Sequence, residues 1–261
     1  MQRLSGKIAV VTGAAGGMGG GITRRFVEEG ATVVCIDIVD PAPRVQELSE
    51  IADDAAIGIT ADVRDLQAMT KAVQGVVERF GKLDVMVNNA GIEQPLQQVV
   101  ETTEDVYREV MDTNLWGVIV GCRVAGAIMR DQGFGAVVNT ASQLGKIAFE
   151  TWGVYSASKA GVISITQAMA RELASCRVRV NAVCPGTFDT PLARRALSAY
   201  AQRDGVELDE LIENYERDAI GLGHLGLPAE MGALCAFLAS DDASFITGAA
   251  INLTGGEQYF F

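Results

Sequence analysis

The run KIAVVTGAAGGMG, from Lys7 to Gly19, gives the clearest indication of the fold of this chain. Its first half, Lys7–Thr12, is short, apolar and rich in β-branched residues, which predicts a buried strand. Glycines at 13, 17 and 19 then allow a tight turn whose backbone can approach a negatively charged group, and a helix starting there would direct its positive end at the same point. The run therefore predicts a strand–turn–helix unit that holds a phosphate, although a purely structural turn would also use such glycines.

Similar apolar runs recur along the chain with helical periodicity between them. We expect the further strands at Thr32–Asp37, Ile57–Ala61, Leu83–Val87, Gly135–Thr140, Arg177–Val183 and Ala250–Leu253. Strands that alternate with helices predict βαβ units and a parallel sheet covered on both faces. The fold class is thus α/β: a doubly wound, Rossmann-type sheet in one domain over residues 1–261.

One segment, Thr187–Gly226, interrupts this alternation because it contains no strand pattern. It carries two amphipathic helical patterns, with Leu192, Ala196 and Tyr200 on one face of the first. Long insertions after a strand are commonly binding loops, so we expect a helical lid over the substrate, with a structural helical hairpin as the alternative.

Composition excludes several classes of protein. The net charge of −12 disfavours nucleic acid and anionic membranes as partners. The 5 cysteines include no CxxC pair and there is 1 histidine, so we expect reduced thiols, no disulfide framework and no metal site. The strand at Lys7 leaves no room for a signal peptide and no apolar run is long enough to cross a bilayer, so we expect a cytoplasmic protein.

Polar residues follow several of the expected strands, at the edge where open α/β sheets bind ligands. Asp37 ends the second strand, where a carboxylate can accept hydrogen bonds from the adenosine ribose and would repel a 2′-phosphate. No lysine or arginine lies at 14–16 or at 38 to offset that repulsion, which favours NAD over NADP. If Asp37 is only a solvated aspartate at the end of a strand, the choice between NAD and NADP stays open.

Tyr155 and Lys159 are four residues apart and therefore lie on one face of a helix. On its own, such a pair is common by chance on the exposed face of a helix. Here Ser142 precedes it, just past an apolar strand, and Asn114 opens another helical segment.

The motifs TGAAGGMG, NNAG, Asn114, Ser142, YSASK and Cys184-Pro185-Gly186 resemble the short-chain dehydrogenase/reductase family, in order and from about Leu4 to Gly256. The resemblance implies that Tyr155 is the general acid/base and that Lys159 assists it and binds the nicotinamide ribose. It also implies that Ser142 holds the substrate oxygen and that Asn114 keeps a water beside Lys159 for proton relay.

The resemblance further implies which residues cradle the dinucleotide. They are Gly13, Gly17, Met18, Asp37, Ile38, Asp62, Val63, Asn89, Gly91, Tyr155, Lys159, Pro185, Gly186, Phe188 and Thr190. The substrate pocket is expected to include Glu93, Gln94, Ser142, Gln143, Phe149, Trp152, Tyr155, Phe188, Leu192 and Tyr200.

The sequence thus predicts an NAD-dependent oxidoreductase that transfers a hydride between nicotinamide and a secondary alcohol or ketone. The polar and aromatic pocket residues suggest a small polyol, hydroxyketone or cyclic alcohol. A 3-oxoacyl-thioester reductase is the alternative enzyme, disfavoured by the acidic insertion, and a non-catalytic dinucleotide-sensing regulator is a remote one. The aromatic end Tyr259–Phe261 suggests burial against another subunit, and family members are commonly tetramers, so we expect a homotetramer.

Overall fold

The computed structural model describes residues 2–257 and contains one seven-stranded sheet in which every neighbouring pair of strands is parallel. The strand order is β3-β2-β1-β4-β5-β6-β7, so the order reverses between β1 and β4. This arrangement confirms the predicted doubly wound, Rossmann-type fold. The strands are β1 (Ile8–Thr12), β2 (Thr32–Asp37), β3 (Ala56–Thr60), β4 (Val85–Asn88), β5 (Gly135–Thr140), β6 (Val178–Pro185) and β7 (Ala250–Leu253).

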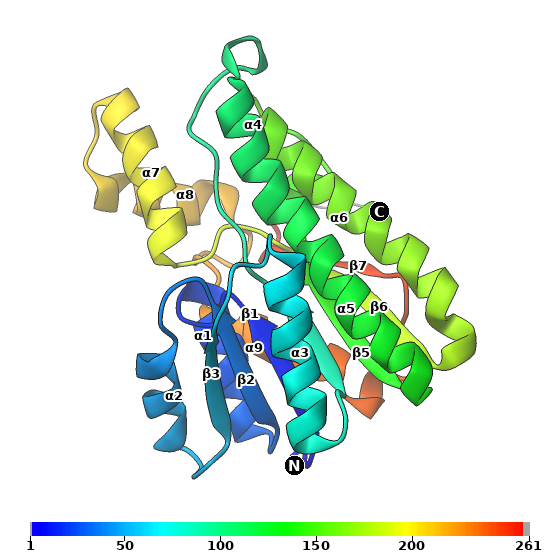
Figure 1. Ribbon diagram of the computed structural model, residues 1–261. Coiled ribbons are helices and arrows are strands. Elements are labelled where there is room, and N and C mark those ends of the chain that lie inside the picture. Colours follow the sequence, from blue (N-terminus) through cyan, green and yellow to red (C-terminus); the bar gives the residue numbers. More distant parts are fainter. Residues whose placement is uncertain (1, 258–261) are drawn as a thin grey trace.

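Helices cover both faces of the sheet (Figure 1). They are α1 (Gly17–Glu28), α2 (Ala42–Ser49), α3 (Leu66–Phe80), α4 (Glu104–Met111), α5 (Gly117–Gln132), α6 (Gly153–Leu173), α7 (Pro191–Asp204), α8 (Leu208–Ala219) and α9 (Pro228–Ala239). Among residues 2–257, no helix is long and apolar enough to cross a membrane.

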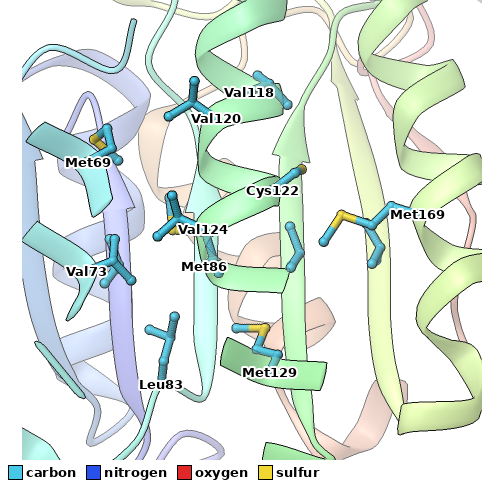
Figure 2. Packing of buried hydrophobic residues seen from close by; sticks show 14 of the residues in the cluster. Met69, Val73, Leu83, Met86, Val118, Val120, Cys122, Val124, Met129 and Met169 are labelled. Atoms are coloured by element: carbon cyan, nitrogen blue, oxygen red, sulfur yellow. The ribbon is translucent and has the colours of Figure 1, made fainter. Parts of the chain in front are cut away.

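Two apolar cores lie on opposite faces of the sheet because neighbouring residues of a buried strand point to opposite sides. One core joins the sheet to α3, α5 and α6, and Figure 2 shows Met69 and Val73 of α3 facing Met86 of β4 and Val124 of α5. The other joins the sheet to α1 and α9. Strands buried on both faces explain the continuous apolar runs in the sequence.

Glycines bring α1 and α9 unusually close. A Cβ on Gly21 would lie 2.0 Å from the Pro228 carbonyl oxygen, and one on Gly232 would lie 2.4 Å from the Gly21 oxygen. A Cβ on Gly20 would meet only the end of the flexible Arg44 side chain, at 2.6 Å. Close backbone packing therefore explains Gly21 in the first helix, and the structure gives no equal requirement for Gly20.

The segment after β6 forms the two helices predicted there, α7 and α8, drawn in yellow beside the sheet in Figure 1. They have a small core of their own, in which Leu197, Ile212, Ile220 and Leu225 are buried. The charged residues Asp204, Glu207, Asp209 and Glu213 are exposed, as the amphipathic pattern predicts.

Candidate active site

A cleft of about 1710 Å³ lies at the carboxyl ends of the strands, from the turn after β1 to α7 and α8. The reversal of strand order between β1 and β4 places it there, because the connections leave the sheet in opposite directions at that point. Its volume exceeds the roughly 300–1,000 Å³ typical of a drug-sized ligand, so it has room for a dinucleotide and a substrate.

The glycine-rich turn is shaped for close approach to a phosphate. Gly13 and Gly17 have φ of 63° and 47°, in the left-handed region that favours glycine. A Cβ on Gly19 would lie 1.9 Å from the Gly13 carbonyl oxygen. The turn is tied to β4 by Asn89, whose Nδ2 donates to the Thr12 oxygen at 3.1 Å. The turn leads directly into α1, so the residues present fit a pyrophosphate at a helix N-terminus.

Asp37 lies at the end of β2 beside this turn. One carboxylate oxygen accepts from the Ala15 amide at 2.9 Å, and the other accepts from the Val39 amide at 3.3 Å. The next residue, Ile38, is 61% exposed and lines the cleft. A carboxylate has about four acceptor positions, so Asp37 can still accept hydrogen bonds from a ribose.

Asp62 lies in the cleft just after β3, the strand next to β2, and is bound by Arg64. The Arg64 guanidinium donates to both of its oxygens, at 2.6 to 3.0 Å, and lowers the pKa of the Asp62 carboxyl. The structure brings together every residue that we expect to hold the cofactor, since all of them line this cleft.

Lys159 lines the floor of the cleft from α6 and is 3% exposed. Its Nζ donates to the Thr140 carbonyl oxygen at 2.9 Å, at the end of β5, and lies 5.6 Å from the centre of the Tyr155 ring. Ser142 follows the same strand end, and its Oγ accepts from the Leu144 amide at 3.1 Å. The sheet and one helix thus bring Ser142, Tyr155 and Lys159 to a single point.

Asn114 lies in a π-helical turn, Asp112–Trp116, between α4 and α5. Such turns commonly occur at functional sites because they change the direction of a side chain. Asn114 accepts from the Ile92 amide and donates to the Ile92 carbonyl, both at 2.8 Å. A Cβ on Gly91 would lie 3.2 Å from Asn114 Oδ1 and 3.4 Å from Lys159 Nζ. Because Gly91 has no side chain, the space next to both groups stays open.

Burial sets the ionisation of this site. Desolvation raises the pKa of Tyr155 to about 12; hydrogen bonding with Ser142 lowers it and the charge of Glu93 raises it. Desolvation also lowers the pKa of Lys159 to about 8. A phenol with a raised pKa keeps its proton near neutral pH, so a positive charge close by is needed to make that proton easier to remove.

The other end of the cleft is lined by Phe149, Trp152, Phe188, Leu192 and Tyr200, all of which we expect to contact the substrate. Trp152 Nε1 donates to the Tyr200 hydroxyl at 2.6 Å, which joins the start of α6 to α7. Phe188 is 4% exposed, and its ring packs against Gly226. The ring is therefore part of the wall and leaves little surface for a ligand.

Glu93 lines this end of the cleft as well. Its Oε1 lies 3.6 Å from Arg195 Nε of α7, while its Oε2 is buried with no hydrogen-bond partner. Burial raises the pKa of the Glu93 carboxyl. Among the described residues, this oxygen, Gln143 Oε1 and Thr151 Oγ1 are buried oxygens without a hydrogen-bond partner on side chains that line the cleft.

Gln94 departs from the expectation of a substrate contact because it lies behind the cleft wall. It is 3% exposed, its Oε1 accepts from the Tyr155 amide at 2.6 Å, and its Nε2 donates to the Thr151 carbonyl at 2.7 Å. Both ends of the amide are thus occupied by the protein. Gln94 anchors the first turn of α6, which carries Tyr155.

Glu257, Thr187 and Tyr215 also line the cleft. Thr187 lies in the Pro185–Thr190 segment that the resemblance places beside the dinucleotide, and Tyr215 lies on the apolar face of the second helix of the insertion. Glu257 belongs to no motif that marks it in the sequence. The expected packing of Tyr259–Phe261 against another subunit lies outside the described residues.

Comparison with known proteins places this site in a family. A family model described as enoyl-(acyl carrier protein) reductase matches residues 13–258. L-fucose dehydrogenase of Oryctolagus cuniculus is 38% identical, over 98% of this chain and 86% of that protein. The 3-oxoacyl-[acyl-carrier-protein] reductase of Thermotoga maritima is 36% identical, over 98% and 99%. The crystal structure of levodione reductase superposes with a TM-score of 0.92 at 31% identity, covering 98% of each chain.

The fold and these matches define an oxidoreductase built on a Rossmann-type sheet. The chain belongs to the short-chain dehydrogenase/reductase family, whose members use nicotinamide cofactors.

Proposed function

We propose that this protein is an NAD-dependent dehydrogenase that interconverts a secondary alcohol and a ketone, with Tyr155 as the acid/base. The observation that carries the proposal is the position of Lys159 Nζ, 5.6 Å from the Tyr155 ring centre and held by the Thr140 carbonyl. A lysine buried at this depth has a role beyond solubility, because burying an ammonium group is costly.

NAD, when bound, supplies the hydride acceptor for alcohol oxidation. The protein has to remove the hydroxyl proton. Tyr155 accepts that proton as a phenolate, and the positive charge of Lys159 stabilises the phenolate. Ser142 donates a hydrogen bond to the substrate oxygen and steadies the charge that develops there. Asn114 holds the Ile92 backbone through both ends of its amide, and Gly91 has no side chain to fill the space beside Lys159 Nζ. In this proposal a water in that space exchanges a proton with Lys159.

The preference for NAD rests on Asp37. Its carboxylate lies at the end of β2, next to the glycine-rich turn, and would meet a 2′-phosphate with a like charge. The nearby exposed side chains, Ile38 and Val39, are apolar and give a phosphate no counter-charge.

The substrate we propose is a small polyol, a hydroxyketone or a cyclic alcohol. Glu93 and Gln143 have buried acceptor oxygens without partners, and a ligand with several hydroxyl groups could donate to them. Phe149, Trp152 and Leu192 provide apolar surface for a carbon skeleton. The names of two similar proteins, an L-fucose dehydrogenase and a levodione reductase, fit such a substrate.

The helices α7 and α8 are proposed to act as a lid that excludes water from the reacting groups. Tyr200 already reaches the start of α6 through its bond to Trp152. We also propose that the enzyme works in the cytoplasm as a homotetramer.

A 3-oxoacyl-thioester reductase is the second candidate, because a 3-oxoacyl-[acyl-carrier-protein] reductase is 36% identical to this chain. The outer surface of α7 and α8 weakens it. Asp204, Glu207, Asp209 and Glu213 are exposed there and would repel an acidic carrier protein.

A spectrophotometric screen tests the proposal directly. The purified protein is assayed at about 340 nm, the absorbance of reduced nicotinamide, with NAD or NADP against polyols, cyclic alcohols and hydroxy acids, and in reverse with NADH or NADPH against ketones and 3-oxoacyl thioesters. We expect NAD reduction with an alcohol to give the highest kcat/KM. Higher kcat/KM for a 3-oxoacyl thioester with NADPH would favour the second candidate and reject the first.

A further inference from the structure

Glu257 lies beyond the end of β7, where the chain turns back toward the cleft. The turn is made by Gly255 and Gly256, with φ of 59° and 83°, and the Glu257 amide donates to the Thr254 oxygen at 3.0 Å. The Leu222 amide, after α8, donates to the Gly255 oxygen at 2.8 Å. This geometry places a half-buried carboxylate in the wall of the substrate end.

Four hydrogen-bond donors from three separate segments converge on this carboxylate. Tyr215 of α8 donates its hydroxyl at 2.6 Å, and Thr187, just after β6, donates its amide at 2.8 Å and its hydroxyl at 3.2 Å. Gln143, next to Ser142, donates its Nε2. The Thr187 and Tyr215 hydroxyls are also 3.1 Å apart.

We infer that Glu257 is a positioning residue for the substrate site, which holds α8, the loop after β6 and Gln143 in one cluster. The C-terminal segment thereby sets where α8 lies over the cleft and how the Gln143 amide is turned. Because Nε2 of Gln143 donates to Glu257, the amide oxygen of Gln143 is the end that remains without a hydrogen-bond partner in the cleft wall.

The charge of the carboxylate is what makes this arrangement specific. An ionised carboxylate only accepts hydrogen bonds, so it can satisfy four donors at once. A glutamine in its place would point an NH₂ group at some of these donors. An alanine would leave the Tyr215 hydroxyl, the Gln143 amide and the Thr187 amide without this acceptor.

The role also explains the small residue at Gly186. A Cβ there would lie 2.5 Å from Glu257 Oε2, so the carboxylate can approach the loop after β6 only because residue 186 is glycine. The loop after β6 and the C-terminal segment that carries Glu257 therefore pack tightly against each other in the wall of the cleft.

The test compares Glu257→Ala and Tyr215→Phe with the wild type, with Glu213→Gln as the control, since Glu213 is an exposed carboxylate on the same helix. Three quantities are measured: the Kd for NAD, kcat and KM for the best alcohol of the screen, and hydrogen exchange of residues 208–219. Of these three measurements, only kcat and KM depend on the proposed function. If the wild type oxidises no alcohol, the proposed function fails, while the exchange comparison still decides the role of Glu257.

We expect Glu257→Ala to lower kcat/KM by about 10- to 100-fold, mainly through KM, because several hydrogen bonds to a charged group are lost. The Kd for NAD should rise by a smaller factor than kcat/KM falls, because Thr187 lies in the loop that also carries Pro185 and Gly186. Residues 208–219 should exchange faster. Tyr215→Phe should give a smaller change in the same direction. In the double variant Glu257→Ala/Tyr215→Phe, kcat/KM should be no lower than in Glu257→Ala alone, because Tyr215 acts through the carboxylate.

Three results would overturn the inference. The first is a Glu257→Ala protein with wild-type KM and wild-type exchange over 208–219. The second is full additivity of the two substitutions. The third is an equal loss of NAD affinity and of exchange protection throughout the chain, which would mean general destabilisation. Tyr215→Phe removes one hydroxyl only, so it keeps the test decisive if Glu257→Ala does not fold.

Discussion

The backbone amide of Tyr155 donates a 2.6 Å hydrogen bond to Oε1 of Gln94, sixty-one positions earlier in the chain. The same Gln94 side chain donates from Nε2 to the Thr151 carbonyl, so it spans the turn that leads into α6. The start of the helix that carries Tyr155 is thus held by a buried amide from the loop after β4. Because helix N-termini leave unpaired amides, Gln94 serves as a cap supplied from outside the helix.

Replacing Gln94 with leucine should therefore lower kcat without changing NAD affinity. The Tyr155 amide and the Thr151 carbonyl would lose their partners, at a cost of about 1–3 kcal/mol each if they stay buried. We expect kcat to fall about 10-fold or more, and thermal unfolding to begin at a lower temperature. Gln97→Leu, in the same loop, is a useful comparison. Unchanged kcat in Gln94→Leu would show that α6 keeps Tyr155 in place without this bond.

Tyr155→Phe should leave the fold and NAD binding intact and reduce turnover. A positioned acid/base contributes about 10²–10⁴-fold, so kcat in steady-state alcohol oxidation should fall by at least that range. Circular dichroism and a fluorescence titration with NAD serve as controls for folding and binding. Near wild-type kcat would assign the proton transfer to another residue.

Asp37→Ala should weaken NAD binding and relax the exclusion of NADP. Removing a charged acceptor costs about 1.5–3 kcal/mol, or about 10- to 150-fold in Kd. The variant also loses the hydrogen bonds from the Ala15 and Val39 amides, so the glycine-rich turn should become more mobile. Both cofactors are titrated against wild type and variant. Tighter binding of NADP than of NAD by the wild type would refute the role of Asp37.

Glu93→Gln should shift the pH dependence of alcohol oxidation to lower pH. The negative charge of Glu93 contributes to the raised pKa of Tyr155, so its removal makes the phenol easier to deprotonate. The rate of oxidation rises with pH as the phenolate forms, so the rising limb of kcat/KM should move down. Glu210→Gln, an exposed carboxylate on α8, should leave the profile unchanged. A shift to higher pH in Glu93→Gln would contradict this electrostatic account.

Glu29 is expected to control stability in acid. Arg3 and Arg25 both pair with its carboxylate, which is 5% exposed, and hydrogen bonding from Arg3 is the main cause that lowers its pKa to about 2. The unfolded state binds this proton at higher pH, near 4.5, so the stabilisation is complete above that value and is lost as pH falls toward 2. Denaturant unfolding from pH 6 to 3 should show a weaker pH dependence for Glu29→Gln. If the free energy of unfolding of Glu29→Gln fell with pH as steeply as that of the wild type, the pairs with Arg3 and Arg25 would contribute no net stability.

The strands and the cofactor cleft could be predicted because their signals are local. A strand buried on both faces has to be apolar throughout, as in KIAVVT, and a turn that admits a phosphate needs glycine at set positions. The predicted bounds of β2, β5 and β7 match the structure, whereas other strand ends differ by one or two residues, as in β4, which begins at Val85. The last paired residue depends on the neighbouring strand, which lies elsewhere in the sequence.

The substrate end was harder to predict. Glu93 and Gln94 are neighbours in a polar loop, yet one lines the cleft and the other supports α6 from behind. Their order in the sequence contains nothing that distinguishes these roles, since in an irregular loop the side-chain direction follows from tertiary contacts. Glu257 was not identified for a similar reason, because its partners are far from it in the chain.

The parallel sheet, the glycine-rich turn and the residue types around Tyr155 follow from local sequence, because each depends on a few neighbouring positions and on backbone chemistry. Which polar groups meet was set by the tertiary structure. Packing places the Gln94 side chain within hydrogen-bond distance of the Tyr155 amide and puts Asn114 in a π-helical turn. It also brings Gln143, Thr187 and Tyr215 into contact with Glu257. Such contacts depend on how strands and helices pack, and a buried polar group finds its partner wherever packing places one.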